Sequence, residues 1–208
     1  MEYQDCRGVR IAVPQSYGDA LRLIASDFFR VTGRMERNPF RLWLRHFRSS
    51  AMGFLFYYRL SSYRRGPAYP YFRLRMEKYV RKYALQIPLS ARVGEGLYLG
   101  HGVSVIVNGS AVIGNNVNLS HFVTIGSLKG SAAVIEDGAY IGPSTSLVED
   151  VRIGSNAMVG AGAVVVRDVP AGAVAAGVPA RIIKENGGYK PVNPVPLCGC
   201  NKQVVHEQ

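Results

Sequence analysis

Aliphatic residues recur every six positions through the second half of the chain. The series has twelve positions, all Val, Ile or Leu, and glycine directly follows seven of them. The positions are Val93, Leu99, Val105, Ile113, Leu119, Ile125, Ile135, Ile141, Leu147, Ile153, Val159 and Val165. Because an ordinary sandwich spaces its turns about 8–12 residues apart, this period argues against one. Six residues are too few for a strand and its return, so we expect three units to close one triangular coil of short parallel strands, and coils to stack.

The six-residue count is interrupted twice. Two extra residues lie between Val105 and Ile113, around residues 107–109, and four lie between Ile125 and Ile135, giving a loop over residues 127–132. Insertions in a stacked solenoid become surface features without disturbing the core. We therefore expect a functional site near these interruptions.

Before the repeats, the hydrophobic residues follow helical spacing. Leu21, Ile24 and Phe28 lie three and four residues apart, and Asn38 followed by Pro39 suits an N-cap and first turn. Helices are expected over about residues 17–31, 39–48, 50–63 and 71–84. The chain is thus divided into an N-terminal helical segment (1–86), a β-helix (87–183) and an extended, proline-rich tail (184–208).

The two main segments differ in charge. Residues 1–90 hold 17 Lys and Arg against 6 Asp and Glu, whereas residues 91–208 hold 8 of each kind. Arginines interleaved with aromatic residues suit peripheral contact with an anionic membrane through residues 1–86. They equally suit helices that pack against the open end of the β-helix, and the sequence leaves both interpretations open. No nucleic-acid-binding motif accompanies the charge, so no nucleic-acid partner is expected.

The cysteines and the apolar runs bear on the compartment. Cys6, Cys198 and Cys200 all lie near the termini, which fits a reducing environment, and no apolar run is long enough to span a bilayer. We expect a cytoplasmic protein, with peripheral contact at the inner face of the membrane as the open alternative. The Cys198-Gly199-Cys200 tail offers two ligands, too few for a zinc site, and no metal is expected.

Two of the four histidines occupy matching places in the repeat. His101 lies two residues after Leu99, His121 lies two residues after Leu119, and these leucines are three units apart. We expect both imidazoles to point outward on one face of the prism, one coil apart. An imidazole accepts a proton near neutral pH, so one of the pair is a candidate general base. The remaining two, His46 and His206, are expected to carry no function.

The residues around His101 resemble a known family. The segment LGHGVSVIVN (99–108) is similar to the catalytic-histidine segment of serine acetyltransferases and of exopolysaccharide acetyltransferases of the colanic acid type. The segment AGVPAR (176–181) is similar to the closing motif near which these enzymes hold coenzyme A. Residues 87–183 thus resemble hexapeptide-repeat acyltransferases, which form left-handed parallel β-helices and assemble as trimers. The resemblance implies a mainly β fold of that hand, a homotrimer, acetyl-CoA as the acetyl donor, and His101 as the general base.

The same resemblance implies where the substrates lie. Acetyl-CoA is expected in the groove between neighbouring subunits, beside small corner residues and basic residues that suit its phosphates. These candidates are Ser127, Pro143, Ser144, Ala161, Arg181 and Lys184. His121 is expected to orient the acceptor or share the proton, and Asn108 to bind the acceptor.

Two departures from the serine acetyltransferase pattern bear on the acceptor. That family has an acidic partner for its histidine where this chain has Gln86, and a longer loop with an Arg-His-Pro run where residues 127–132 contain neither His nor Arg. His121 instead matches the colanic-type enzymes. We therefore expect transfer to a hydroxyl of a sugar or lipid-linked glycan in exopolysaccharide biosynthesis. The alternatives are a serine O-acetyltransferase of cysteine biosynthesis and, in another class, a metal-dependent or noncatalytic β-helix protein.

Overall fold

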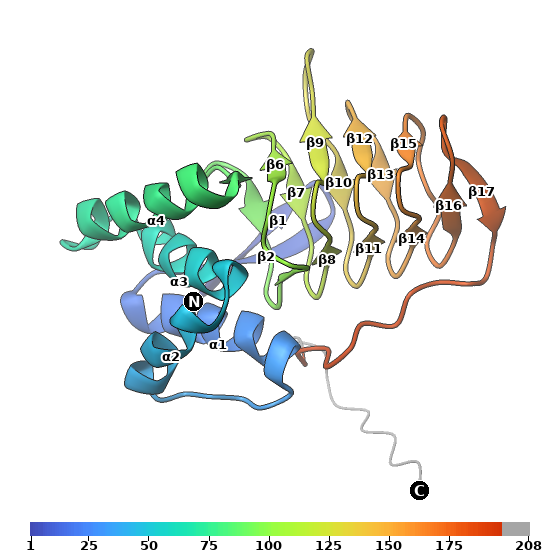
Figure 1. The fold of residues 1–208 in the computed structure, drawn as a ribbon. Coiled ribbons are helices and arrows are strands. Elements are labelled where there is room, and N and C mark those ends of the chain that lie inside the picture. The colour runs from blue at the N-terminus through green and yellow to red at the C-terminus, as the bar shows by residue number, and fades with distance from the viewer. Residues whose placement is uncertain (197–208) are drawn as a thin grey trace, which may run out of the picture.

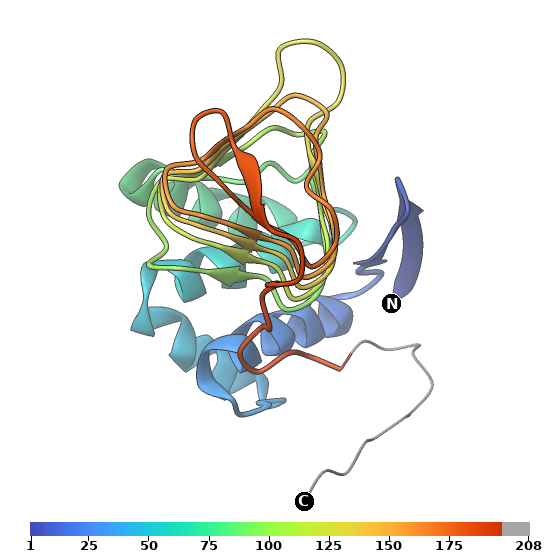
Figure 2. The ribbon, with the colours of Figure 1, turned by 90° about the vertical axis from the view of Figure 1, so that its right-hand side faces the viewer.

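A computed structural model describes residues 1–196, and its larger part is a parallel β-helix with three flat faces (Figures 1 and 2). The first face consists of β4 (Arg92–Val93), β7 (Val112–Ile113), β10 (Val134–Ile135) and β13 (Arg152–Ile153). The second face consists of β5 (Tyr98–Leu99), β8 (Asn118–Leu119), β11 (Tyr140–Ile141), β14 (Met158–Val159), β16 (Val174–Ala176) and the antiparallel β17 (Arg181–Lys184). The third face consists of β3 (Leu85–Gln86), β6 (Val105–Val107), β9 (Thr124–Gly126), β12 (Ser146–Val148) and β15 (Val164–Val165). The predicted left-handed parallel β-helix behind an N-terminal helical region is confirmed.

Aliphatic side chains of the predicted series fill the interior of the β-helix. On the first face Val93, Ile113, Ile135 and Ile153 pair in register from coil to coil. All four are buried, and full burial of such a side chain stabilises a fold by about 1.5–3 kcal/mol. The six-residue period therefore reports a real stack of coils.

The first insertion lies elsewhere than the count predicted. On the third face Val107, and not Val105, pairs with Ile125. Leu99 and Val107 are eight residues apart, whereas the equivalent Leu119 and Ile125 are six apart. The two extra residues therefore belong to the corner between β5 and β6, which carries His101. Counting could not place them because Val105 and Val107 both point into the core.

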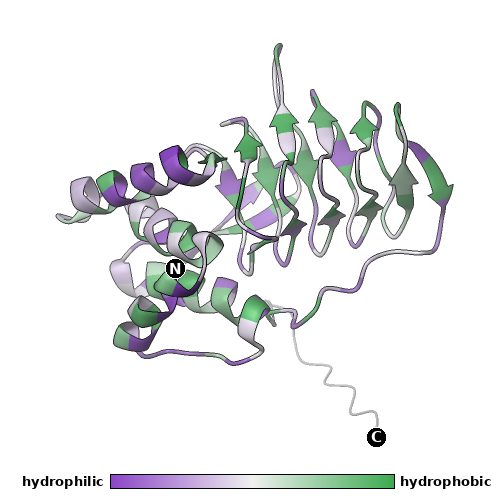
Figure 3. Cartoon of the chain, viewed as in Figure 1, coloured by the Kyte–Doolittle hydropathy of each residue, from purple (hydrophilic) through white to green (hydrophobic). Residues whose placement is uncertain are grey.

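The predicted helices cover the N-terminal end of the β-helix (Figure 1). They are α1 (Tyr17–Thr32), α2 (Pro39–Arg45), the 3₁₀ turn η1 (His46–Arg48), α3 (Ser50–Ser62) and α4 (Tyr69–Tyr83). The N-cap of α2 is Asn38, whose Oδ1 accepts a hydrogen bond from the Phe40 N–H at 2.9 Å, as expected. One hydrophobic core joins the helices to the interior of the β-helix, so the aromatic residues of α3 close its open end. Figure 3 shows that α4 carries hydrophilic bands, because much of this helix faces solvent.

A buried ion pair fastens these helices to the first coil. Asp27 of α1 accepts hydrogen bonds from Arg59 of α3 at 2.8 and 3.0 Å, and both side chains are almost fully buried. The same guanidinium donates to the carbonyls of Val93 and Gly94 at 3.0 and 2.6 Å, and Asp27 accepts from the Leu97 N–H at 2.8 Å. Two helices and one coil thus share a single polar junction.

The N-terminal segment is not wholly helical, contrary to the prediction. Residues 2–13 form an antiparallel hairpin of β1 (Glu2–Cys6) and β2 (Val9–Val13), which packs on the outer side of the first face. The turn residues Arg7 and Gly8 have φ of 57° and 86°. The β-helix also begins earlier than expected, at Leu85, because β3 pairs with β6.

After β17 the chain runs back along the β-helix towards the helices (Figure 1). The Tyr189 N–H donates to the Asn156 carbonyl at 2.8 Å, and Val195 exchanges two hydrogen bonds with the side chain of Asn116 at 2.8 and 3.0 Å. The Arg30 guanidinium donates to the Val192 carbonyl at 2.9 Å. Residues 185–196, the C-terminal segment, contain no helix or strand and contact their own chain. The expectations for Cys198, Cys200 and His206 fall outside the described residues.

Within residues 1–196, no helix has both the length and the apolar character that crossing a bilayer requires.

Candidate active site

Two imidazoles meet at one edge of the β-helix, between the second and third faces. The ring centroids of His101 and His121 lie 5.0 Å apart with an interplanar angle of 83°. His101 is exposed, whereas His121 is half-buried. The Nδ1 atom of His121 is buried and has no hydrogen-bond partner in the described part of the chain. The structure therefore brings the two predicted imidazoles together, and the Nδ1 atom of His121 makes no hydrogen bond within residues 1–196.

The corner that carries His101 is built by its extra residues and by α3. His101, Gly102 and Ser104 all have positive φ, at 62°, 58° and 49°, which makes the corner bulge outward. The Ser50 hydroxyl donates to the His101 carbonyl at 3.2 Å, and a Cβ on Gly102 would stand 2.4 Å from the backbone nitrogen of Ala51. The start of α3 therefore fixes the position of His101. His101 and His121 are not at equivalent positions of their coils. The Phe122 N–H donates to the Val103 carbonyl at 3.4 Å, so His121 stacks on Val103. The two imidazoles nevertheless meet.

Three of the expected cofactor residues lie along the same edge. The Ser144 N–H donates to the His121 carbonyl at 3.0 Å, and the Gly162 N–H donates to the Pro143 carbonyl at 2.8 Å. Pro143 therefore stacks one coil beyond His121, and Ala161 one coil beyond Pro143. Ser144 and Ala161 are exposed. The edge thus offers an imidazole pair followed by small side chains, and an elongated molecule can approach its backbone closely.

The two basic candidates lie at the far end of the β-helix. Arg181 and Lys184 are the first and last residues of β17, and both are exposed. The turn before Arg181 returns to the third face, where the Ala180 N–H donates to the Val164 carbonyl at 2.8 Å. Three strand spacings, about 14 Å, separate this turn from the coil of His121. Arg181 therefore lies towards the edge of the imidazoles, whereas Lys184 lies at the other end of its strand.

Asn108 and Ser127 lie across the third face from the imidazoles, where β6 and β9 end. Asn108 Oδ1 accepts from the Ser110 N–H at 3.0 Å, and its Nδ2 donates to the Ser127 carbonyl at 3.4 Å. Since both ends of the amide hold the turns of the coil together, a role of Asn108 in binding an acceptor stays a prediction without geometric support. The expected role of Ser127 in binding acetyl-CoA likewise stays a prediction, since its hydroxyl donates to Glu149 at 2.8 Å.

Glu149 organises the loop over residues 127–132 and was not expected to. Its carboxylate accepts from the Leu128 N–H at 3.1 Å and from the hydroxyl of Ser127. The hydrogen bond from Leu128, followed by that from Ser127, holds the pKa of Glu149 below its usual range. Its position 21 residues after Leu128 gave no sequence signal.

Gln86 of β3 stands where the serine acetyltransferase pattern has an acidic partner for its histidine. Among residues 1–196, no carboxylate hydrogen-bonds or ion-pairs with His101 or His121. Gln86 is exposed on β3 and pairs with Ile106. The same residues contain no cluster of three His, Cys, Asp or Glu side chains of the kind that holds a metal. The imidazoles on this edge can transfer a proton.

His46 lies elsewhere, in the helical region. It is buried between Phe56, which stacks on it at 5.0 Å, and Tyr57, whose hydroxyl lies 3.3 Å from Nε2. Burial lowers the pKa of His46 below its ordinary 6.5, since it disfavours the charged ring. This histidine packs the core, whereas an exposed and inactive one was expected.

The repeat matches a known protein family. Residues 132–167 match the model described as bacterial transferase hexapeptide (six repeats). Serine acetyltransferase 2 of Arabidopsis thaliana is 39% identical over 106 residues, which are 49% of this chain and 33% of that protein. The serine acetyltransferase of Escherichia coli K12 is 34% identical over 113 residues, 52% of this chain and 41% of that protein. The chain thus spans well under half the length of these curated relatives.

Solved structures give longer matches. A soybean serine acetyltransferase complexed with serine is 31% identical, with a TM-score of 0.65, and the match covers 79% of this chain and 70% of that one. The serine acetyltransferase of Brucella abortus strain S19 is 26% identical, with a TM-score of 0.65, and the match covers 84% and 71%. The similarity therefore extends beyond the repeats into the helical segment.

Proposed function

The chain belongs to the hexapeptide-repeat acyltransferase family that includes the serine acetyltransferases, and we propose from this that it transfers acetyl from acetyl-CoA to a hydroxyl group. The single observation that carries the proposal is the imidazole pair, 5.0 Å apart, on an edge that continues into small exposed corner residues. An exposed imidazole can take a proton from a hydroxyl, and the small corners leave room for an elongated donor.

His101 is the general base in this proposal. One of its ring nitrogens accepts the proton of the acceptor hydroxyl as the oxygen attacks the thioester carbonyl, and the proton then passes to the departing thiolate sulfur. Acetyl-CoA supplies, when bound, the activated acetyl group. Pro143, Ser144 and Ala161 border the donor, and Arg181 attracts its phosphates. His121 orients the acceptor, because its ring lies beside that of His101.

L-Serine is the acceptor that the relatives favour. The Arabidopsis and Escherichia coli proteins are both named serine acetyltransferases, and the soybean enzyme is in complex with serine. These similarities support the serine alternative more than the sugar acceptor that the sequence alone favoured, and they give no support to exopolysaccharide biosynthesis. Cysteine biosynthesis is the corresponding pathway.

A sugar hydroxyl is the second candidate, because two observations in this chain favour it. Gln86 stands where the serine-specific pattern has an acid, and no carboxylate in residues 1–196 contacts the imidazoles. The loop over residues 127–132 lacks the His and Arg of that pattern. A neutral acceptor without an amino-acid head group does not need the loop residues, and Gln86 is a second departure from the serine-specific pattern.

A homotrimer completes the proposed site. Its support is the apolar side chains exposed on and beside the third face, such as Ile106 and Phe122, which are 41% and 54% exposed in one chain. Association through such side chains would remove them from water and form the groove for the donor. Membrane contact through residues 1–86 stays a prediction, for which exposed Phe40, Trp43 and Phe47 beside arginines are the favourable feature.

Release of the free thiol of CoA tests the proposal. The purified chain is assayed with acetyl-CoA and either L-serine or a panel of sugars and oligosaccharides. Turnover with L-serine is expected. Turnover with sugars and none with L-serine would show that a sugar hydroxyl is the acceptor. His101→Ala should abolish turnover while the trimer mass is kept, and His121→Ala should raise KM for the acceptor. Thiol release from neither class of acceptor, or full turnover by His101→Ala, would refute the proposal.

A further inference from the structure

A second cleft lies between the N-terminal hairpin, the C-terminal end of α3 and the first face. Its volume is about 580 Å³, and its lining contains no residue of the His101 corner. The walls combine apolar side chains, among them Leu23 and Leu89, with the hydroxyl-bearing Ser62, Tyr63 and Ser90. A cleft of this size accommodates a small molecule.

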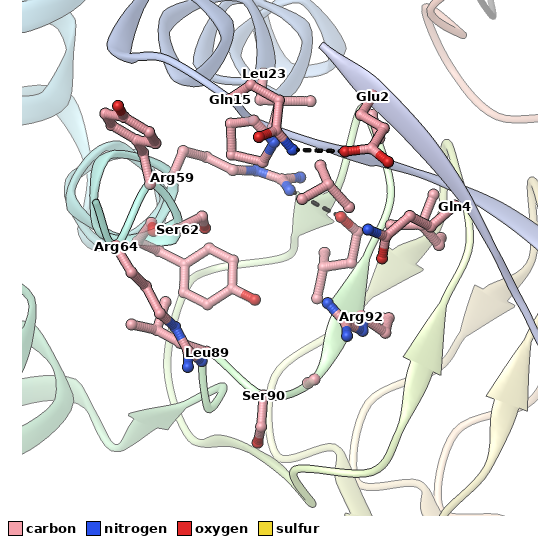
Figure 4. A pocket seen from close by; sticks show the side chains of 18 of the residues that line it. Glu2, Gln4, Gln15, Leu23, Arg59, Ser62, Arg64, Leu89, Ser90 and Arg92 are labelled. Carbon is pink, nitrogen blue, oxygen red and sulfur yellow. Dashed lines mark hydrogen bonds between the residues drawn. The ribbon is translucent and has the colours of Figure 1, made fainter. Parts of the chain in front are cut away.

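The charge in this cleft is positive on balance. Arg64, Arg65 and Arg92 all line it, and none of them is ion-paired within residues 1–196. Figure 4 shows Arg64 and Arg92 entering the cleft from different elements. The carboxylate in the lining, Glu2, accepts a hydrogen bond from Gln15 at 2.9 Å.

The fourth arginine of the lining is already used. Arg59 is bound to the buried Asp27 and to two carbonyls of the first coil, so its charge is balanced within the fold. Burial raises the pKa of Tyr58 to about 12, whereas the charges of Arg59, then Arg64 and Arg92, act in the opposite direction. Arg64 and Arg92 line the same cleft from different parts of the chain, one after α3 and one in β4.

Guanidinium groups bind carboxylate and phosphate through paired, charge-assisted hydrogen bonds. We propose that this cleft binds a small molecule carrying phosphate or carboxylate groups, held by Arg64 and Arg92, with its apolar part against Leu23 and Leu89. Such a site shares no lining residue with the proposed acetyl-transfer site.

The cleft and the His101 corner lie at opposite ends of α3. Arg59 and Ser62 of α3 line the cleft, whereas Ser50 and Ala51 at its beginning contact His101 and Gly102. The helix has 13 residues and therefore spans about 18 Å. A ligand that holds the end of α3 stabilises the docked helix and with it the His101 corner, so the cleft is a regulatory site.

Calorimetric titration of the full chain tests the binding. Inorganic phosphate and malonate serve as separate probes. Sodium chloride keeps the ionic strength constant, so that the screening of the arginine charges is the same at every probe concentration. Saturable binding of at least one probe is expected, and its identity distinguishes phosphate from carboxylate ligands. Arg64→Gln/Arg92→Gln should weaken it at least tenfold, whereas Arg81→Gln, on the exposed face of α4, should not. No saturable binding, or equal binding by both variants, would overturn the site.

Hydrogen exchange tests the link to the His101 corner. The probe that binds should slow amide exchange in peptides covering residues 49–56 and 100–106 of the wild type, with no such change in the double variant. Binding without slower exchange there would overturn the regulatory role. Neither measurement uses the transfer reaction, so the result stands apart from the proposed function.

Discussion

Gly102 offers a sharp test of how α3 positions His101. Its φ of +58° is a left-handed conformation, which costs a residue with a Cβ about 1–2 kcal/mol. The added Cβ of Gly102→Ala would also stand 2.4 Å from the Ala51 nitrogen, about 1 Å closer than atoms in ordinary contact. Gly172 provides the matched control, because its φ is +69° and nothing lies within 4 Å of a Cβ there.

Both variants should therefore lose about 1–2 kcal/mol of unfolding free energy from backbone strain, and only Gly102→Ala should move the corner. A displacement of about 1 Å at a reacting group can lower the rate about 100-fold. We expect kcat/KM for thiol release to fall by roughly that factor in Gly102→Ala and to stay near wild type in Gly172→Ala. Urea unfolding measures the strain separately. Equal turnover in the two variants would refute the idea that α3 positions His101.

Three further variants test the fold around the site. Arg59→Ala leaves Asp27 buried without its partner, so urea unfolding should show a loss of about 3–5 kcal/mol, against under about 1 kcal/mol for the exposed Arg22→Ala; similar losses would contradict the junction. The pKa of His46 is below its ordinary 6.5, so the unfolded chain binds more protons than the folded chain below about pH 6.5. The free energy of unfolding therefore decreases as the pH is lowered through that range. His46→Gln should lose less stability than wild type between pH 7.5 and 5.5, and an unchanged pH dependence would contradict this. Glu149→Ala frees the loop over residues 127–132, so trypsin should cleave after Lys129 faster, and an unchanged rate would exclude the proposed anchoring.

The stacked coils were predictable because their interior is a one-dimensional repeat. On the first face each aliphatic residue of the series pairs with its counterpart one coil away, so the period locates the core there. The corner at His101 was harder, because Val105 and Val107 both point inward and six-residue counting selects the first of them. Strand pairing was needed to locate the extra residues.

Features that depend on distant contacts were not predictable. Asp27 and Arg59 are 32 residues apart and belong to a type that usually stays in water, so their burial had no local signal. The N-terminal hairpin has no Asn-Gly or Asp-Gly at its turn, and Arg7 in a left-handed conformation is uncommon. The histidine pair was predictable because each histidine lies two residues after a leucine of the repeat, even though the stacking partner of His121 is Val103.

The C-terminal segment changes how this solenoid should come apart. In a simple stack each coil touches only its neighbours, so the last coil can peel away while the others remain. Here residues 187–195 tie the last coil to Asn156, Asn116 and Arg30 in turn, and so reach back to the helices. Detaching the final turn therefore also breaks contacts at the first. A chain that would otherwise fray from one end is made to unfold as a single cooperative unit.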